Sequence, residues 1–333
     1  ALAVVAIAAG GASAAGGVTA RAARANRAGP PRLAVGARGV VANDLSTSHS
    51  VTVFQGMRPV ATVPVAGPTP LDAVVTPDDR LALVTNPGAA GSVQAIDLAA
   101  SPPRVEPPIR VSGNGFRAVA PDGRTAWDPN PSSTTITPLD LATTPPTPQA
   151  PFSVGFKPVS VAATPDGKDL WVVRYAAGAM RHVFVAGGRH DLGPIVKLGP
   201  DPLLVTLDDA ATVAYVTFIE PRGGTSAVDL TTGAAAHVRM GSGYGPIAVD
   251  PADPSVVYFA DQVGRTVIPV QVSGLSMRPG RPVAVPHGPA YGRSMPCAVA
   301  VGPAGNDLRV ADGGSFVSGR RRPAKGTPCR STA

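Results

Sequence analysis

The sequence predicts an all-β fold built from a unit of four short strands that recurs along the chain. The first observation is spacing, because apolar runs open every 44 residues, at Pro70, Asn114, Pro158, Pro202 and Pro246. The second is turn chemistry: Pro-Asp-Gly or Pro-Asp-Asp separates the first two strands of three units and supplies the backbone angles of tight turns. The third is that no helical periodicity interrupts the strands. Four-strand units of about 40–50 residues are typical of propeller blades, so we expect a seven-bladed β-propeller of four-stranded antiparallel blades.

Each unit shows the same order of residue types. The first strand carries small residues that fit the crowded inner edge of a ring, namely Ala73, Ala118, Ala162, Ala248 and Ala298. The second strand carries bulky side chains that fill the wider gap between blades, namely Trp171, Tyr215 and Phe259. Third strands follow at 92–98, 134–141 and 226–230, and fourth strands end near the joints at 154–158 and 198–202.

A ring explains why such small sheets can be stable. One blade has two apolar faces and cannot bury either alone, whereas blades stacked around an axis bury both. The units start near residues 33, 70, 114, 158, 202, 246 and 296, the first of them shortened and the last delayed to a spacing of 50. An open β-solenoid is the competing architecture.

Several segments resemble YVTN-type β-propeller repeats. They are "ALVTN" at 82–86, "AYVTF" at 214–218, the Pro-Asp-Gly turns, and the third strands ending in "IDL", "LDL" and "VDL". The resemblance covers roughly residues 33–315 and implies a seven-bladed propeller of the YVTN/lactonase-like superfamily. The sequence departs from it at 209–211, where Asp-Ala-Ala replaces the turn, and at "WDPN" (127–130). In the last unit, either "SFVSGRRRP" (315–323) supplies a third strand or the start of the chain lends one.

The two ends of the chain differ from the body, for which we expect the range 33–318. Residues 1–32 begin with an apolar stretch and an Ala-Ser-Ala pattern at 12–14, which predicts a truncated secretory signal followed by a flexible basic linker. A membrane anchor is the alternative, although the stretch is at best marginal for a span. We therefore expect a secreted or extracytoplasmic protein with no stable membrane span in the mature chain. Export agrees with a bridge between Cys297 and Cys329, with two free thiols as the alternative.

The net charge of +7 comes from the tails. Residues 1–32 and the C-terminal tail, 319–333, are basic and carry no acid, which leaves 20 basic against 22 acidic residues in the body. Specific nucleic-acid binding uses a basic stripe on a folded face, and this distribution does not predict one.

The joint before a first strand and the loop after a second strand should lie on one face, around the channel mouth, because the strands are antiparallel. This places a ligand-binding face at Asn43, Asn86, Lys157, Tyr175, Tyr244, Asp261, Tyr291 and Asp312. Loops on rigid scaffolds often carry function, although these residues fit ordinary polar loops as well.

We expect a non-catalytic binding scaffold that recognises a protein, glycan or small molecule at the channel mouth. No G-x-S-x-G elbow and no metal-ligand spacing occurs, so no metal and no cofactor is predicted. The alternative, motivated by the family resemblance, is a lactonase-like hydrolase. Its polar groups at the channel mouth would be Arg174, Glu220, Arg222, His287 and Arg293. Fold alone does not choose between the two functions.

Overall fold

The computed structural model shows a chain made almost entirely of β-strands. It describes residues 6–7, 12–14, 18–20, 38–43, 50–55, 58–66, 72–86, 91–111, 115, 118–176, 178–219, 223–241, 245–285, 296–301, 307–312 and 315–320. Within these ranges the one helical element is a short 3₁₀ turn, η1 (Ala186–Gly188). No helix in the described part of the chain is long and apolar enough to cross a membrane.

The strands form antiparallel sheets, most of them built from consecutive strands. The first three sheets comprise β1 (Ala6–Ile7), β4 (Arg38–Asn43), β5 (Ser50–Gln55) and β6 (Arg58–Pro64); β7 (Asp72–Val75), β8 (Leu81–Asn86), β9 (Ser92–Asp97), β10 (Arg104–Val105) and β11 (Ile109–Arg110); and β12 (Ala118–Val119), β13 (Thr125–Pro129), β14 (Thr135–Asp140), β15 (Thr147–Pro148) and β16 (Phe152–Ser153).

The next two sheets each have four strands. They comprise β17 (Ser160–Ala163), β18 (Asp169–Arg174), β19 (Ala179–Phe184) and β20 (Asp191–Lys197); and β21 (Pro202–Leu207), β22 (Val213–Phe218), β23 (Thr225–Asp229) and β24 (Ala235–Val238).

The remaining strands make two further sheets and a separate hairpin. They comprise β25 (Ile247–Val249), β26 (Val256–Asp261), β27 (Thr266–Ser273), β28 (Ser276–Pro279) and β29 (Val283–Ala284); β30 (Pro296–Val301), β31 (Asp307–Asp312) and β32 (Ser315–Arg320); and the hairpin of β2 (Ala12–Ala14) with β3 (Val18–Ala20).

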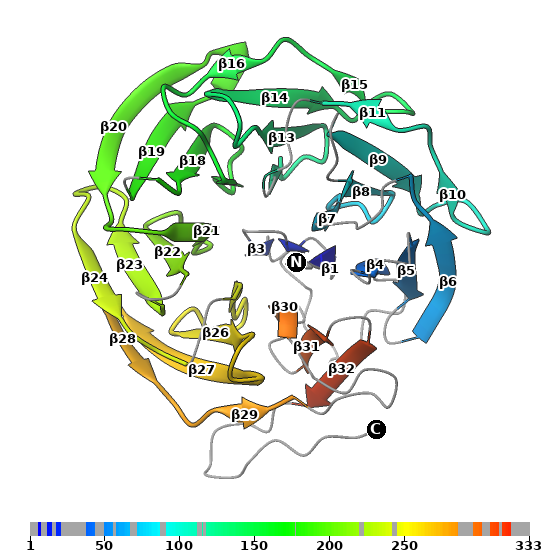
Figure 1. Cartoon of the computed structure of the whole chain (residues 1–333). Coiled ribbons are helices and arrows are strands. Elements are labelled where there is room, and N and C mark those ends of the chain that lie inside the picture. The colour runs from blue at the N-terminus through cyan, green and yellow to red at the C-terminus, as the bar shows by residue number, and fades with distance from the viewer. Residues whose placement is uncertain are drawn as a thin grey trace, which may run out of the picture.

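The sheets stand around a common centre, each with one face turned toward the next sheet (Figure 1). Strand β21 lies near the centre and β24 lies at the rim, so the chain runs outward through each sheet before it enters the next (Figure 1). This radial arrangement differs from the open β-solenoid considered as an alternative.

Bulky second-strand side chains fill the gaps between the sheets, as the repeat pattern predicts. Trp171 of β18 is buried in a cluster with Val205 and Ala214 of the following sheet. Phe259 of β26 is fully buried in another such cluster, which also holds Tyr215 of the preceding sheet. Since each cluster draws residues from two sheets, the apolar core lies mainly between sheets.

The turns between first and second strands have the expected geometry. The N–H of Gly167 donates to the carbonyl of Thr164 at 2.9 Å, and Gly167 has a φ of +71°. In the unit where Asp-Ala-Ala replaces this turn, the N–H of Ala211 donates to the carbonyl of Asp208 at 3.0 Å with a φ of +51°. The departure from the repeat pattern therefore keeps the turn but places a residue with a Cβ in the left-handed region.

Both ends of the chain contribute strands. Strand β32, within "SFVSGRRRP", pairs with β31 as the third strand of the last sheet. Strand β1 pairs with β4 in the first sheet rather than in the last. The third strand of the last sheet therefore comes from the "SFVSGRRRP" segment. The start of the chain contributes a strand to the first sheet instead.

The packing between sheets predicts a large difference between two Phe→Ala substitutions. Phe259 is 0 % exposed, whereas Phe184 at the end of β19 is 42 % exposed. We expect Phe259→Ala to lower the free energy of unfolding by about 3–5 kcal/mol and Phe184→Ala to lower it by about 1 kcal/mol or less. Urea unfolding of the two variants measures this. Equal losses would contradict a core located between the sheets.

Candidate functional site

The joints before first strands and the ends of second strands lie together, as the antiparallel order predicts. The N–H of Ile219, which follows β22, donates to the carbonyl of Asp201 in the joint before β21 at 3.0 Å. The N–H of Ala260 near the end of β26 donates to the carbonyl of Pro246 in the joint before β25, also at 3.0 Å. We call this side of the ring the joint face.

Two arginines gather around one aromatic ring on the joint face. The Cζ atoms of Arg174 and Arg181 lie 6.0 Å and 5.6 Å from the centroid of the Phe156 ring, within the range of a cation–π contact. Arg181 also donates from Nη1 to the carbonyl of Val154 at 2.7 Å, while its Nε is buried and has no hydrogen-bond partner among the described residues. Gly155 leaves the room for this, because a Cβ there would lie 2.5 Å from Nη1. We call Phe156, Lys157, Arg174, Tyr175, Arg181 and Asp201 the Phe156 cluster.

Tyr175 and Lys157 extend this cluster. Partial desolvation raises the pKa of the Tyr175 phenol, and the negative charge of Asp201 and its hydrogen bond to the phenol raise it further. Tyr175 follows β18, and Asp201 precedes the neighbouring sheet, so this contact bridges two sheets. Lys157 is exposed and adjoins Phe156 in the chain. Of the residues proposed from sequence, Lys157, Arg174 and Tyr175 therefore come from one joint region.

The other described members of the proposed ligand face are buried. Asn86 is 3 % exposed at the end of β8, and within the described part of the chain neither Oδ1 nor Nδ2 of its amide has a hydrogen-bond partner. Asp261 is also buried, and its Oδ1 accepts a hydrogen bond from the N–H of Gly264 at 2.9 Å. The carboxylate of Asp261 therefore holds the turn after β26.

The remaining proposed residues cannot be placed with their side chains. Glu220, Arg222, Tyr244, His287, Tyr291, Arg293 and Cys329 lie outside the described residues. Asn43, Asp312 and Cys297 lie in β4, β31 and β30, where only the backbone is described.

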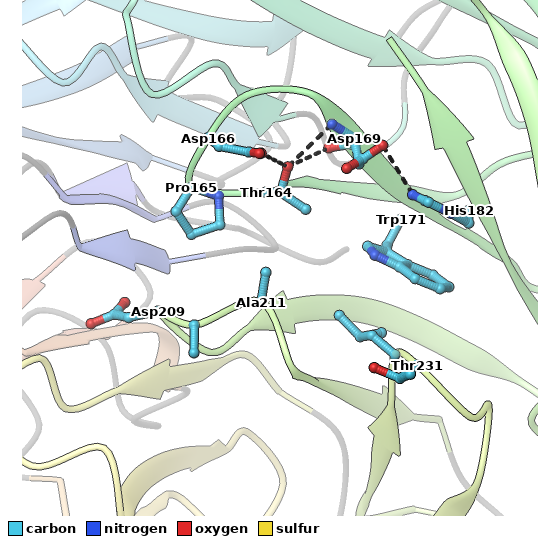
Figure 2. A pocket seen from close by; sticks show the side chains of 11 residues that line it. Thr164, Pro165, Asp166, Asp169, Trp171, His182, Asp209, Ala211 and Thr231 are labelled. Atoms are coloured by element: carbon cyan, nitrogen blue, oxygen red, sulfur yellow. Dashed lines mark hydrogen bonds and ion pairs between the residues drawn. The ribbon is translucent and has the colours of Figure 1, made fainter. Parts of the chain in front are cut away.

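A pocket of about 360 Å³ opens on the opposite side of the ring, between the β17–β20 and β21–β24 sheets (Figure 2). Its lining comes from the turns and strand starts of these two sheets: Thr164, Pro165, Asp166, Asp169, Trp171, His182, Asp209, Ala210, Ala211, Leu230 and Thr231. We call it the inter-sheet pocket. Sequence reasoning did not propose any of these residues as a site.

His182 is held on two sides within the inter-sheet pocket. Its Nε2 lies 3.1 Å from Oδ1 of Asp169, and its ring stacks on Trp171 with centroids 4.7 Å apart and planes 11° apart. Phe184 covers a further part of the ring at 4.3 Å. Asp169 and His182 are each about one-fifth exposed, so this pair reaches solvent through the pocket.

The rim of the inter-sheet pocket is a hydrogen-bonded turn. Thr164 Oγ1 donates to Oδ1 of Asp166 at 2.7 Å and accepts from the N–H of Asp169 at 3.1 Å. The hydrogen bond from Thr164 is the main reason why the pKa of Asp166 is lowered, and contacts with Lys168 also lower it. Thr76 and Asp78 repeat this arrangement in the β7–β11 sheet, so Asp166 belongs first to the turn.

Within the described residues, no group of three or more His, Cys, Asp or Glu side chains could hold a metal ion. The carboxylates of the inter-sheet pocket therefore do not form a metal centre with one another.

Comparisons with known proteins bear on the fold. No protein-family model and no curated protein matches the chain. A solved protein from Lactobacillus plantarum is similar with a TM-score of 0.70 and 12% identity, over 89% of this chain and 95% of that one. Kuenenia stuttgartiensis hydrazine synthase is similar with a TM-score of 0.69 and 16% identity, over 85% and 92%. A candidate 6-phosphogluconolactonase from Bacteroides uniformis is similar with a TM-score of 0.59 and 13% identity, over 74% and 82%.

The fold is a β-propeller. Identities this low show the architecture alone, so the function must be argued from the sites on this propeller.

The lowered pKa of Asp166 predicts a specific dependence of stability on pH. A carboxyl whose folded-state pKa lies below its ordinary value of 3.8 contributes stability above that value, and loses it as the pH falls through the folded-state pKa. We expect Asp166→Asn to be less stable than the native chain at about pH 6–7, and the difference to shrink below about pH 4. Urea unfolding at both pH values measures it. A difference that stays constant with pH would show that Asp166 acts only through neutral hydrogen bonds.

Proposed function

We propose that this chain is an exported, seven-bladed β-propeller of the YVTN type that acts as a non-catalytic binding scaffold. It binds an acidic partner, bearing carboxylate or phosphate groups, at the Phe156 cluster on the joint face. The single observation that carries this proposal is that the guanidinium groups of Arg174 and Arg181 both lie beside the Phe156 ring, while Nε of Arg181 has no acceptor among the described residues.

The chemistry of the Phe156 cluster selects an anion. Guanidinium groups present several N–H donors in a fixed plane and match carboxylate and phosphate oxygens. Val154 satisfies one donor of Arg181, and the buried Nε still needs an acceptor. A buried unsatisfied donor costs roughly 1–3 kcal/mol, and an anionic ligand near Arg181 and Arg174 would offset part of that cost through its attraction to the two guanidinium charges.

The location also suits a scaffold. The Phe156 cluster is built from two joints, the end of β18 and the middle of β19, and its two arginines stand on paired strands. Strand register fixes Arg181 opposite Val172, two residues before Arg174, which puts both arginines on the same face of the sheet. Side chains on such a rigid backbone lose little conformational entropy when a ligand binds, which favours binding.

Charge reversal at the Phe156 cluster tests this function. A fluorescently labelled hexaglutamate peptide serves as the probe, and its binding should weaken as salt is added. We expect Arg174→Glu to weaken binding at least about fivefold. The matched control is Arg278→Glu, which changes the net charge equally on an exposed strand of another sheet and should weaken binding less than about twofold. Equal weakening in both variants would show a general charge effect and overturn the proposed site.

A lactonase-like hydrolase is the second candidate, and the fold similarity to candidate 6-phosphogluconolactonases favours it. Arg174 would then hold an anionic group of the substrate, with Glu220, Arg222, His287 and Arg293 as further candidates. Hydrolysis of 6-phosphogluconolactone by the purified chain, above background and lost in Arg174→Gln, would establish this second function in place of a pure scaffold.

The proposed export predicts a disulfide bond that can be tested. An oxidising compartment favours a bridge between Cys297 and Cys329, which would tie the C-terminal tail to the propeller. We expect a tryptic digest without reductant to contain one peptide pair joined through these cysteines, and reduction to separate the pair. Mass spectrometry distinguishes this result from two free thiols, which would contradict the proposed bridge.

A further inference from the structure

The inter-sheet pocket lies at two positions where four other sheets carry Thr or an apolar residue. The residue paired with the bulky second-strand side chain is Ala95, Pro138, Ala227 or Ile268 in four of the described sheets, and it is His182 opposite Trp171. Two positions before the bulky residue, the same sheets carry Leu81, Thr125, Val213 and Val257, whereas β18 carries Asp169. The β17–β20 sheet thus replaces two inter-sheet positions with an Asp–His pair.

The facing sheet leaves space opposite this pair. Its first turn is Asp209, Ala210 and Ala211, all of which line the pocket. Asp209 and Ala211 lie across the opening from Pro165 and Asp166 (Figure 2). The volume of about 360 Å³ falls at the lower end of the range for small-molecule sites. Trp171, Leu230 and Pro165 give the pocket an apolar wall.

The charges of the pocket select the ligand. Asp166, Asp169 and Asp209 line it, and no lysine or arginine is among its described lining residues. Lys168 pairs with Asp166 at the rim, its Nζ 3.4 Å from Oδ2, so Asp169 is the carboxylate on which cation binding would depend. Anions are therefore disfavoured. The inability of these residues to form a three-ligand metal group, noted above for the described chain, favours an organic cation over a metal ion. An indole wall adds attraction for such a cation.

We propose that the inter-sheet pocket binds a small organic cation, an alkylguanidinium or alkylammonium group whose apolar stem lies along Trp171 and Leu230 and whose head reaches Asp169. His182 acts as a positioning residue, because its contacts with Asp169 and Trp171 fix the carboxylate beside the indole. The cation comes from a free small molecule or from an arginine side chain of another protein. This site lies on the opposite side of the ring from the Phe156 cluster and does not depend on the function proposed there.

Calorimetric titration of the full chain tests the inference with defined probes. Butylguanidinium should bind at least about tenfold more tightly than neutral butylurea, and butanoate should not bind. Asp169→Asn should reduce the affinity for butylguanidinium at least about tenfold, whereas Asp140→Asn, which changes a carboxylate of another sheet, should leave it unchanged. Equal binding of butylguanidinium and butylurea, or equal effects of the two substitutions, overturns the proposal.

A second variant and an optical readout locate the site. Ala210 is exposed at the pocket edge, so Ala210→Trp should block the pocket and abolish binding without removing a charge. The chain has two tryptophans, so the variant Trp127→Phe leaves Trp171 as the single indole fluorophore. Its fluorescence should change in proportion to the occupancy measured by calorimetry. Binding that survives Ala210→Trp, or that leaves Trp171 fluorescence unchanged, overturns the assignment to this pocket.

The source of the cation is distinguished by one further probe. N-acetylarginine amide carries the same head group on a peptide-like backbone. Binding of this probe within about threefold of butylguanidinium supports recognition of an arginine side chain, whereas binding of butylguanidinium alone supports a free small cation. Both outcomes support the cation site, and failure of both probes overturns it.

Discussion

The structure depends on apolar contact between neighbouring sheets. A sheet of four short strands has two faces to bury and little interior of its own. Trp171 and Phe259 each reach across to an adjacent sheet and are buried there. Every sheet with a neighbour on either side is therefore stabilised from two directions, and the ring positions the loops that connect the strands.

Both candidate sites lie at boundaries of the same sheet, β17–β20. One face of this sheet packs against the β12–β16 sheet and carries Arg174 and Arg181 near Phe156. The other face packs against the β21–β24 sheet and carries Asp169 and His182. Arg174 and Arg181 lie toward the joint face of the ring, on the side of the sheet that faces β12–β16. Asp169 lies toward the opposite side of the ring, on the side of the sheet that faces β21–β24. This separation keeps the two sets of charges apart and lets one sheet offer sites for ligands of opposite sign.

The repeat made the fold predictable, because spacing, turn residues and second-strand aromatics all describe the same unit. Topology also allowed Lys157, Arg174 and Tyr175 to be placed on one face before their contacts were known. Arg181 and His182 could not be found in this way, since residues within strands were assigned to the sheet rather than to a site. A signal for His182 was present: aligned by strand pairing, it is a polar residue where four other described sheets carry Ala, Pro or Ile.

The replacement of apolar residues by Asp169 and His182 has an energetic meaning. Burying an aliphatic side chain contributes about 1.5–3 kcal/mol, and the β17–β20 sheet forgoes that contribution at Asp169, where two other sheets carry the buried Leu81 and Val257. The sheet can tolerate the loss because Leu170 and Val172 on its other face are fully buried against the preceding sheet. A propeller thus permits one boundary to be polar while its neighbours hold the sheet in place. Repeats of this kind can carry polar residues at one boundary between sheets without changing the ring, and a comparison of equivalent positions within one chain identifies that boundary.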